Sequence, residues 1–373
     1  MYYPNFVGGA EKSIQVLAEN LVSDGNDVVV ISTNSKSYID EINGVRVYYE
    51  NPKNLYWSSE DRKNNTILEK FIWHGLDAYN IRIKERISAI LDQENPDIVH
   101  TNNLSGISVL AWKIAKNKGF KVVHTIRDYY LICPKTTMFK NNTNCKNQCL
   151  DCRIFSFSKK KLSNSVDAVV GVSNFVLEKH LSLGYFSTAV LTKVIGNEIV
   201  INPPPKKRFD LKKVSFGYLG RLTESKGIEY LLSIFSNLSG VDNWELIVAG
   251  KGEAKYENEL KIKFNDLKIN FVGVVNSDEF YNNIDVLIVP SLWHEPFGRV
   301  IIEGIKHKKI VIASKRGGIQ ELTGLSHLFD PDKKDDLENL VLSVLKNQTL
   351  SELNYEYKNN ITNQYFELYK SIL

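Results

Sequence analysis

Two carboxylates, Glu295 and Glu303, bracket a short segment that could bind an elongated polar ligand. On one ideal helix they would lie ~12 Å apart along the axis and on different faces, so they would not share one proton. Between them, Phe297 and Gly298 open a predicted helix whose first N–H groups attract anions. The order along the segment is a carboxylate, backbone amide donors and a second carboxylate. Carboxylates suit hydroxyl groups and amide donors suit phosphate, so the segment matches the sugar, phosphate and ribose of a sugar nucleotide. For either glutamate alone, an ordinary capping or solvated role is the better interpretation.

These residues must be positioned by a strand, a loop, a helix and a second strand. The apolar run 286–289 predicts a buried strand, residues 298–306 a short helix, and residues 310–313 another buried strand. Strand, helix and strand in this order imply a parallel sheet with a crossover helix. Ligands on such sheets bind beyond the carboxyl ends of the strands, which is where the loop 291–296 falls.

A second loop of this type carries positive charge. Residues 214–219 predict a strand that runs into Gly220, and a helix follows from residue 228. The loop between them contains Arg221 and Lys226, two cations that could neutralise a leaving diphosphate. The spacing is not that of a Walker loop, so nucleotide hydrolysis of the P-loop type is not indicated.

Four sequence blocks together resemble the family-4 retaining glycosyltransferases of GT-B fold, also called glycosyl transferases group 1. They are E-P-F-G-x-x-x-x-E from Glu295 to Glu303, GGAEK from Gly8 to Lys12, GRLTESKG from Gly220 to Gly227, and GGIQE from Gly317 to Glu321. The resemblance covers nearly the whole chain and is densest between residues 214 and 330. It implies an α/β fold of the GT-B type, with two Rossmann-like domains facing a cleft.

The expected domains follow from this resemblance. Residues 1–200 form an acceptor-side domain, residues 201–350 bind the nucleotide sugar, and residues 351–373 supply a helix that crosses back to the first domain. The linker Asn202–Lys207 contains three consecutive prolines, which cannot continue a helix or a central strand.

The resemblance also implies residue roles in a sugar transfer that retains the anomeric configuration. Arg221 and Lys226 would hold the diphosphate, Glu295 the sugar hydroxyls and Glu303 the ribose. Backbone groups would complete the nucleotide-sugar site, at Gly8, Gly9, Gly220, Gly273, Phe297 and Gly298. No side chain is assigned as a base, because the departing phosphate would take the acceptor proton. No catalytic metal is implied, and Asp330-Pro-Asp332 is interpreted as a turn before a helix.

The sequence departs from the family pattern at three places. No room exists for the usual strand before Gly8, and Asn102 and Arg127 stand where many relatives carry histidine. Asn102, Arg127 and Asp128 follow predicted strand ends, so we expect acceptor-side or sugar-side contacts from them. Two alternatives therefore stay open: a sugar-nucleotide-binding subunit without turnover, and a sugar-nucleotide epimerase or phosphorylase.

All four cysteines fall within 20 residues, at Cys133, Cys145, Cys149 and Cys152. Four thiolates suit tetrahedral zinc, although the spacing C-x11-C-x3-C-x2-C is not that of a standard zinc ribbon. A structural zinc, unligated thiols and a redox pair are all compatible with the pattern.

Composition indicates a soluble globular protein, with 43% hydrophobic and 24% charged residues and a net charge of +4. This charge does not indicate nucleic-acid binding. Between Arg127 and Lys161, however, eight basic residues face only two acidic ones. With Phe155 and Phe157 nearby, this segment indicates either a solvated basic surface or contact with an anionic membrane or pyrophosphate-bearing acceptor. We expect a cytoplasmic protein, either free or at the inner face of the membrane, that uses a UDP-, GDP- or ADP-sugar and a glycan or lipid-linked acceptor.

Overall fold

The computed structural model describes residues 8–56, 66–199, 213–238, 241–266, 268–322, 324, 326–346 and 360–373. The predicted proline linker and the segment before Gly8 lie outside these residues. The chain divides into two compact units. Unit 1 comprises residues 1–138, 146–198 and 358–373, and unit 2 comprises residues 139–145 and 199–357. Within the described residues, no helix is both long and apolar enough to cross a membrane.

Unit 2 is built on a six-stranded sheet in the order β12-β11-β10-β13-β14-β15, with every neighbouring pair parallel. The strands are β10 (Val214–Leu219), β11 (Trp244–Ala249), β12 (Ile269–Gly273), β13 (Val286–Val289), β14 (Ile310–Ser314) and β15 (His327–Phe329). β13 is buried at all four positions, because helices cover both of its faces. The predicted strands at 214–219, 286–289 and 310–313 are confirmed.

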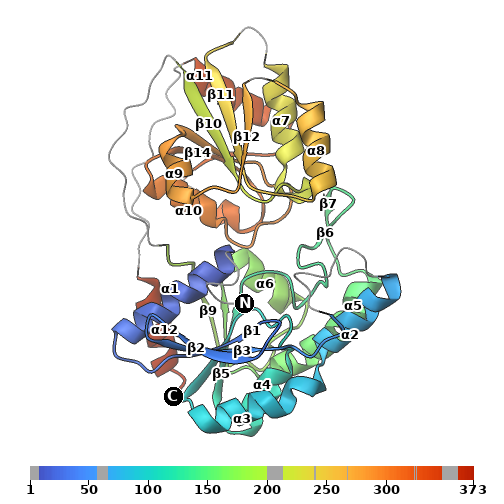
Figure 1. The fold of residues 1–373 in the computed structure, drawn as a ribbon, viewed down its shortest axis with the longest axis vertical. Helices are drawn as coiled ribbons and strands as arrows, with labels where there is room; N and C mark the ends of the chain where they lie inside the picture. The colour runs from blue at the N-terminus through green and yellow to red at the C-terminus, as the bar shows by residue number, and fades with distance from the viewer. Residues whose placement is uncertain are drawn as a thin grey trace. The chain divides into compact units, whose positions relative to one another are not determined.

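Helices cover both faces of this sheet (Figure 1). Apolar residues of α7 (Ile228–Asn237), α8 (Ala254–Lys263) and α11 (Asp336–Leu345) pack with Phe216, Leu246 and Ile288 in one core cluster. On the other face lie α9 (Ser277–Asn282) and α10 (Arg299–Lys306). α9 is capped by Asn276, whose Oδ1 accepts from the N–H groups of Asp278 and Glu279.

Unit 1 contains two sheets. In the first, β1 (Val29–Thr33) is parallel to β3 (Val45–Glu50), and β2 (Tyr38–Ile42) is antiparallel to β3. The second is wholly parallel, in the order β4-β5-β8-β9. Its strands are β4 (Ile98–Thr101), β5 (Lys121–Ile126), β8 (Ala168–Gly171) and β9 (Leu191–Val194).

The helix α1 (Gly9–Ser23) links these two sheets. Its Ala18 packs against Val45 and Val47 of β3, whereas Leu17 and Leu21 pack with residues of β5 and β8. α12 (Ile361–Lys370) lies beside α1 and adds Tyr365 and Leu368 to the same core (Figure 1). The last helix of the chain therefore belongs to the core of unit 1.

The remaining helices of unit 1 are α2 (Ile67–Ala78), α3 (Lys84–Glu94), α4 (Leu110–Asn117), α5 (Leu150–Leu162) and α6 (Asn174–Ser182). The sequence from residue 66 to 91 reads as one long helical stretch, but the structure divides it into α2 and α3. Asn80 causes the break: its Oδ1 accepts from the Arg82 N–H, and its Nδ2 donates to the Pro52 carbonyl. These bonds make a short 3-10 turn, Ile81–Ile83, in place of a continuous helix.

Candidate functional site

The centre of the candidate site is a buried ion pair between Lys226 and Glu295. Lys226 Nζ lies 2.5 Å from Glu295 Oε1, and the Ser291 hydroxyl donates to the same oxygen at 2.6 Å. Burial alone would raise the pKa of Glu295, but the Lys226 charge and these hydrogen bonds hold the pKa below its usual value. The carboxylate is therefore ionised, and Lys226 keeps a partly exposed ammonium that also lies 5.2 Å from the Trp293 ring.

The segment 290–297, which we call the acid loop, is held by backbone contacts on two sides. The N–H groups of Leu292 and Trp293 both donate to the Ser225 carbonyl, and Gly318 N–H donates to the Glu295 carbonyl at 2.7 Å. Gly227 packs so closely that an added Cβ would lie 1.9 Å from the Pro290 carbonyl oxygen. The glycines of the GRLTESKG and GGIQE blocks thus let neighbouring backbone approach the acid loop directly.

Arg221 and the glycines at the strand ends surround the same edge of the sheet. The Arg221 side chain is exposed, and its carbonyl accepts from the Tyr218 hydroxyl at 2.7 Å. Burial raises the pKa of that hydroxyl, the charge of Glu295 raises it further, and the charge of Arg221 opposes the shift. Gly250 lies close to both neighbouring strand ends: its N–H donates to the Gly273 carbonyl, and an added Cβ would lie 1.8 Å from the Gly220 carbonyl oxygen.

The helix that follows the acid loop begins at Arg299, with Gly298 as its N-cap in the left-handed region at φ 96°. No side chain caps this end of the helix, and a helix N-terminus attracts anions. Glu303 is buried inside α10, where Arg299 Nε donates to one carboxylate oxygen at 2.8 Å and the Tyr281 hydroxyl to the other at 3.2 Å. Phe297 is buried beside the helix start.

Sequence reasoning missed Asn144, which contacts the acid loop from a distant part of the chain. It lies in a two-stranded hairpin, β6 (Phe139–Lys140) and β7 (Thr143–Asn144), that groups with unit 2. Asn144 Nδ2 donates to the Leu292 carbonyl at 2.7 Å, and His294 N–H donates to Asn144 Oδ1 at 2.8 Å. One amide side chain therefore bridges two backbone positions of the acid loop. No local pattern in the sequence signals a contact between positions so far apart.

In unit 1, the predicted acceptor-side residues are held by one another. Arg127 Nε donates to Asn102 Oδ1 at 2.7 Å, and a second guanidinium nitrogen donates to Asn197. Asp128 accepts from Asn103 Nδ2 at 3.0 Å and from Tyr130 N–H at 2.7 Å. Removal from water raises the pKa of Asp128 to about 6. The side chains at these strand ends thus form polar pairs that could bind hydroxyl groups.

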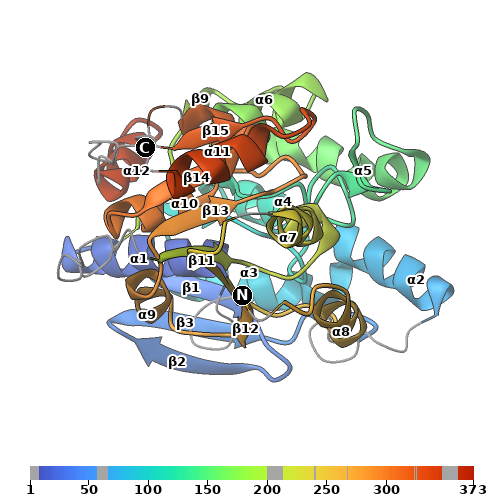
Figure 2. The ribbon, with the colours of Figure 1, turned by 90° about the horizontal axis from the view of Figure 1, so that it is seen from above.

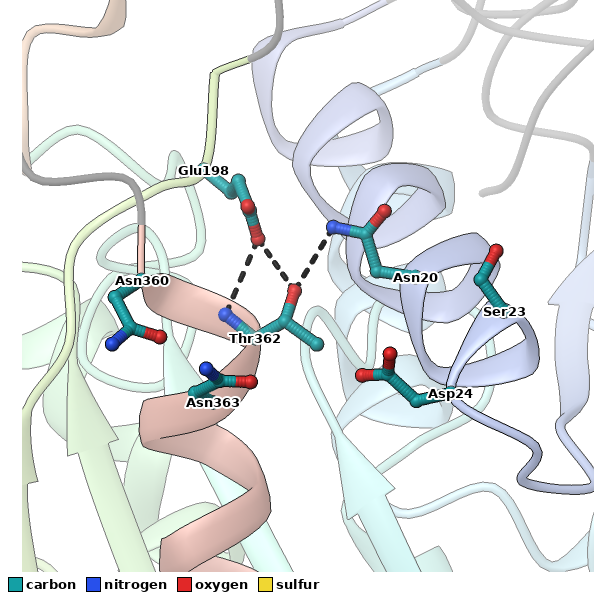
Figure 3. Close-up of a pocket in the computed structure, with 7 residues that line it drawn as sticks. All are labelled: Asn20, Ser23, Asp24, Glu198, Asn360, Thr362 and Asn363. Carbon is teal, nitrogen blue, oxygen red and sulfur yellow. Dashed lines mark hydrogen bonds between the residues drawn. The ribbon is translucent and has the colours of Figure 1, made fainter.

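Gly8 and Gly9 also lie in unit 1, as the N-cap and first residue of α1, and no side chain caps that helix. A polar cavity of about 220 Å³ opens near the other end of α1 (Figure 3). Its wall carries the carboxylates of Asp24 and Glu198, and Glu198 accepts from both the N–H and the hydroxyl of Thr362. Two carboxylates do not suit a diphosphate, and none of the predicted donor-binding residues lines this cavity.

Three of the cysteines, Cys133, Cys149 and Cys152, lie close together in unit 1. Cys149 and Cys152 have their sulfur atoms 3.4 Å apart, and the Cys152 side chain is hydrogen-bonded to Cys133. In the part of the chain that the structure describes, no three His, Cys, Asp or Glu side chains form a metal-binding group. The structural-zinc assignment stays a prediction. Lys159, expected on a basic surface, is buried instead: it donates to the Tyr130 carbonyl, and burial lowers its pKa to about 8.

Comparison with known families matches both halves of the chain. The family model described as "Glycosyl transferases group 1" matches residues 202–364, and the model described as "Glycosyltransferase Family 4" matches residues 7–191. A Klebsiella pneumoniae protein, "Uncharacterized 42.6 kDa protein in cps region", is 34% identical over 99% of this chain and 98% of its own length. A Salmonella typhimurium "Lipopolysaccharide 1,2-N-acetylglucosaminetransferase" is 31% identical over 40% of this chain and 43% of its own.

Solved structures share the fold at low sequence identity. Anabaena Alr3699/HepE, in complex with UDP and glucose, superimposes with a TM-score of 0.67 at 17% identity, covering 98% of this chain and 96% of its own. The catalytic domain of Arabidopsis thaliana starch synthase IV, bound to ADP and acarbose, gives 0.69 at 15% identity, covering 99% and 97%. These likenesses establish a GT-B arrangement of two Rossmann-like domains.

Proposed function

Because the chain belongs to the glycosyl transferases group 1 family and is therefore a glycosyltransferase, we propose that it moves a sugar from a nucleotide-sugar donor to a glycan or lipid-linked acceptor, with retention at the anomeric carbon. The relatives named for the cps region and for lipopolysaccharide support a role in bacterial surface polysaccharide synthesis. A cytoplasmic location at the inner face of the membrane belongs to the same proposal.

One observation carries the proposal: the Lys226–Glu295 pair lies at the carboxyl end of a parallel sheet. A lysine paired with a buried carboxylate is fixed in place before the ligand arrives, so its charge need not reorganise as a diphosphate departs. The exposed Arg221 side chain, close enough for its charge to act on Tyr218, supplies a second cation.

The other predicted roles fit this arrangement. Glu295 accepts sugar hydroxyls, the amides at Phe297 and Gly298 donate to phosphate, and Glu303 accepts from the ribose. The backbone groups at Gly220 and Gly273 lie at the carboxyl ends of β10 and β12, on either side of β11, where a nucleoside would bind. Gly8 and Gly9 contribute donors from unit 1. No side chain acts as the base, because the leaving phosphate oxygen takes the acceptor proton.

A panel of UDP-, GDP- and ADP-sugars, tested by thermal shift, identifies the donor. A ligand at 100 times its Kd stabilises the folded protein by about 2.7 kcal/mol. We expect one nucleotide class to raise the melting temperature, and the double variant R221A/K226A to lose that shift. The anomeric proton of the transferred sugar, measured by NMR, then tests retention. A melting temperature that responds to no nucleotide sugar would contradict the proposal.

Zinc at Cys133, Cys145, Cys149 and Cys152 is a separate proposal, supported by the spacing and by the contacts among three of the thiols. An ion would have to draw the four sulfurs toward one point, about 2.3 Å from each. Metal analysis of protein purified without chelators should find one zinc per chain, and substitution of Cys149 by serine should abolish it. Protein with all four thiols reactive and no zinc would contradict this proposal.

A further inference from the structure

An exposed apolar surface runs along two packed helices of unit 1, α2 and α5. Figures 1 and 2 show the two helices side by side, and Phe71 of α2 meets Phe155 of α5 edge to face, with ring centroids 4.8 Å apart. The two helices also carry large apolar side chains that are half or more exposed: Ile67 (89%), Leu68 (68%), Phe71 (52%), Leu150 (72%), Ile154 (52%) and Phe157 (72%). Exposed large apolar side chains gathered on two packed helices are a feature that marks interaction sites.

The spacing of these residues explains why they share a surface. On α5, Leu150, Ile154 and Phe157 are separated by four and three positions, so they form one stripe. The opposite side of α5 faces the interior: Phe155 is buried against α2, and Lys159 is buried over the Tyr130 ring at 3.4 Å. These inward contacts hold the exposed stripe in a fixed orientation.

Positive charge flanks the apolar stripe. Arg153, Lys160 and Lys161 are exposed on α5, and Lys70 is exposed on α2. Arg153 follows Leu150 by three positions, and Lys160 follows Phe157 by three, so the cations border the stripe directly. Apolar side chains bordered by Lys and Arg are the composition of helices that lie in a membrane interface, where the cations meet anionic headgroups.

We propose that this surface, formed by the exposed residues of α2 and α5, docks unit 1 onto an anionic lipid bilayer. The apolar side chains enter the boundary between headgroups and acyl chains, and the four cations remain at the phosphate level. Neither helix crosses the bilayer. The inference deepens the proposed function, because a lipid-linked acceptor would be presented at the same membrane.

Vesicle flotation tests the docking without donor or acceptor, so its outcome is independent of turnover. The full chain should float with phosphatidylglycerol vesicles and much less with phosphatidylcholine vesicles, and salt should weaken the binding. The double variant I154S/F157S should bind at least about tenfold more weakly, because it loses two apolar side chains. The variant K160Q/K161Q should lose about fivefold per charge.

Matched controls come from α8 of unit 2, where Ile262 is 80% exposed and Lys255 is exposed. I262S and K255Q should bind vesicles as the wild type does, and all variants should keep the wild-type unfolding temperature because the substituted side chains are exposed. Binding unaffected by I154S/F157S, or no flotation with anionic vesicles, overturns the proposal. So does a dimer in light scattering that I154S/F157S converts to monomers, since a second copy would then cover the patch. A protein that floats but transfers no sugar would refute the proposed function alone.

Discussion

The two units fix their strand-end residues in different ways. In unit 2, backbone groups hold the acid loop: Ser225 and Gly318 bond to it, and Gly227 touches it without a side chain between. In unit 1, side chains hold side chains, as Arg127 does with Asn102 and Asn197. A loop fixed by close backbone contact tolerates only residues that are small enough and that can adopt the required φ. A pair of hydrogen-bonded side chains can be replaced by another pair without a change in the backbone. We infer that unit 2 has the narrower tolerance for sequence change, and that unit 1 is where specificity can vary.

The largest expected effect comes from adding one methyl group at Gly227. This residue has φ +71°, and a Cβ would lie 1.9 Å from the Pro290 carbonyl oxygen. Strain and displacement together should cost more than about 3 kcal/mol of unfolding free energy in G227A. The control is G25A in unit 1, where φ is +86° but nothing lies within 4 Å of the added atom. Backbone strain alone should then cost ~1–2 kcal/mol. If urea unfolding showed equal losses of unfolding free energy in G227A and G25A, the close contact between Gly227 and Pro290 would not be what restricts substitution in unit 2.

The next largest effect concerns the ion pair of the acid loop. K226A should lower turnover by about 10²–10³-fold, because a preorganised cation is removed from the departing diphosphate. It should also lower the unfolding free energy by ~3 kcal/mol, because Glu295 is left buried and unpaired. K226A/E295Q separates the two effects: stability should recover, since no uncompensated charge remains, while turnover stays low. If turnover recovered together with stability, Lys226 would be a structural residue only.

Acid should weaken unit 1 through its buried histidines. Burial lowers the pKa of His180 to about 4, and burial also lowers that of His124. The pKa of His180 is lower in the folded protein than in the unfolded chain. The free energy of unfolding is therefore undiminished above pH 6.5, and it falls as the pH drops toward 4 because the unfolded chain binds the proton first. At pH 5, proton binding by unfolded His180 should cost about 2 kcal/mol relative to pH 7. Denaturant titrations at pH 7 and pH 5 should show that the free energy of unfolding of H180Q falls less than that of the wild type, by that amount. If the free energies of unfolding of H180Q and the wild type fell equally between pH 7 and pH 5, His180 would be protonated in the folded state.

Sequence predicted the strands and loops of unit 2 better than the surface of unit 1, for identifiable reasons. Strands such as 286–289 are uninterrupted apolar runs, and the glycine blocks stand directly after them, so both the elements and their order could be read locally. Lys159 could not be placed in this way, because its burial depends on Tyr130 from another segment. The exposed residues of α2 were likewise not identified, because helical spacing indicates an apolar face but not whether another element covers it. The break at Asn80 depends on a bond to Pro52, again from a distant segment.

The smallest predicted effect tests whether a side chain can also position the acid loop. Asn144 makes two hydrogen bonds to it, each worth about 0.5–1.5 kcal/mol, while Ser225 and Gly318 hold the same loop independently. N144A should therefore lower kcat by about tenfold or less and lower the melting temperature by only a few degrees. N144D keeps the acceptor for His294 N–H but sets a charge against the Leu292 carbonyl, so it should be at least as impaired as N144A. K140A, at an exposed position of the same hairpin, is the control and should match the wild type. If N144A were as damaging as K226A, a side-chain contact would govern the loop, and the contrast between the two units would fail.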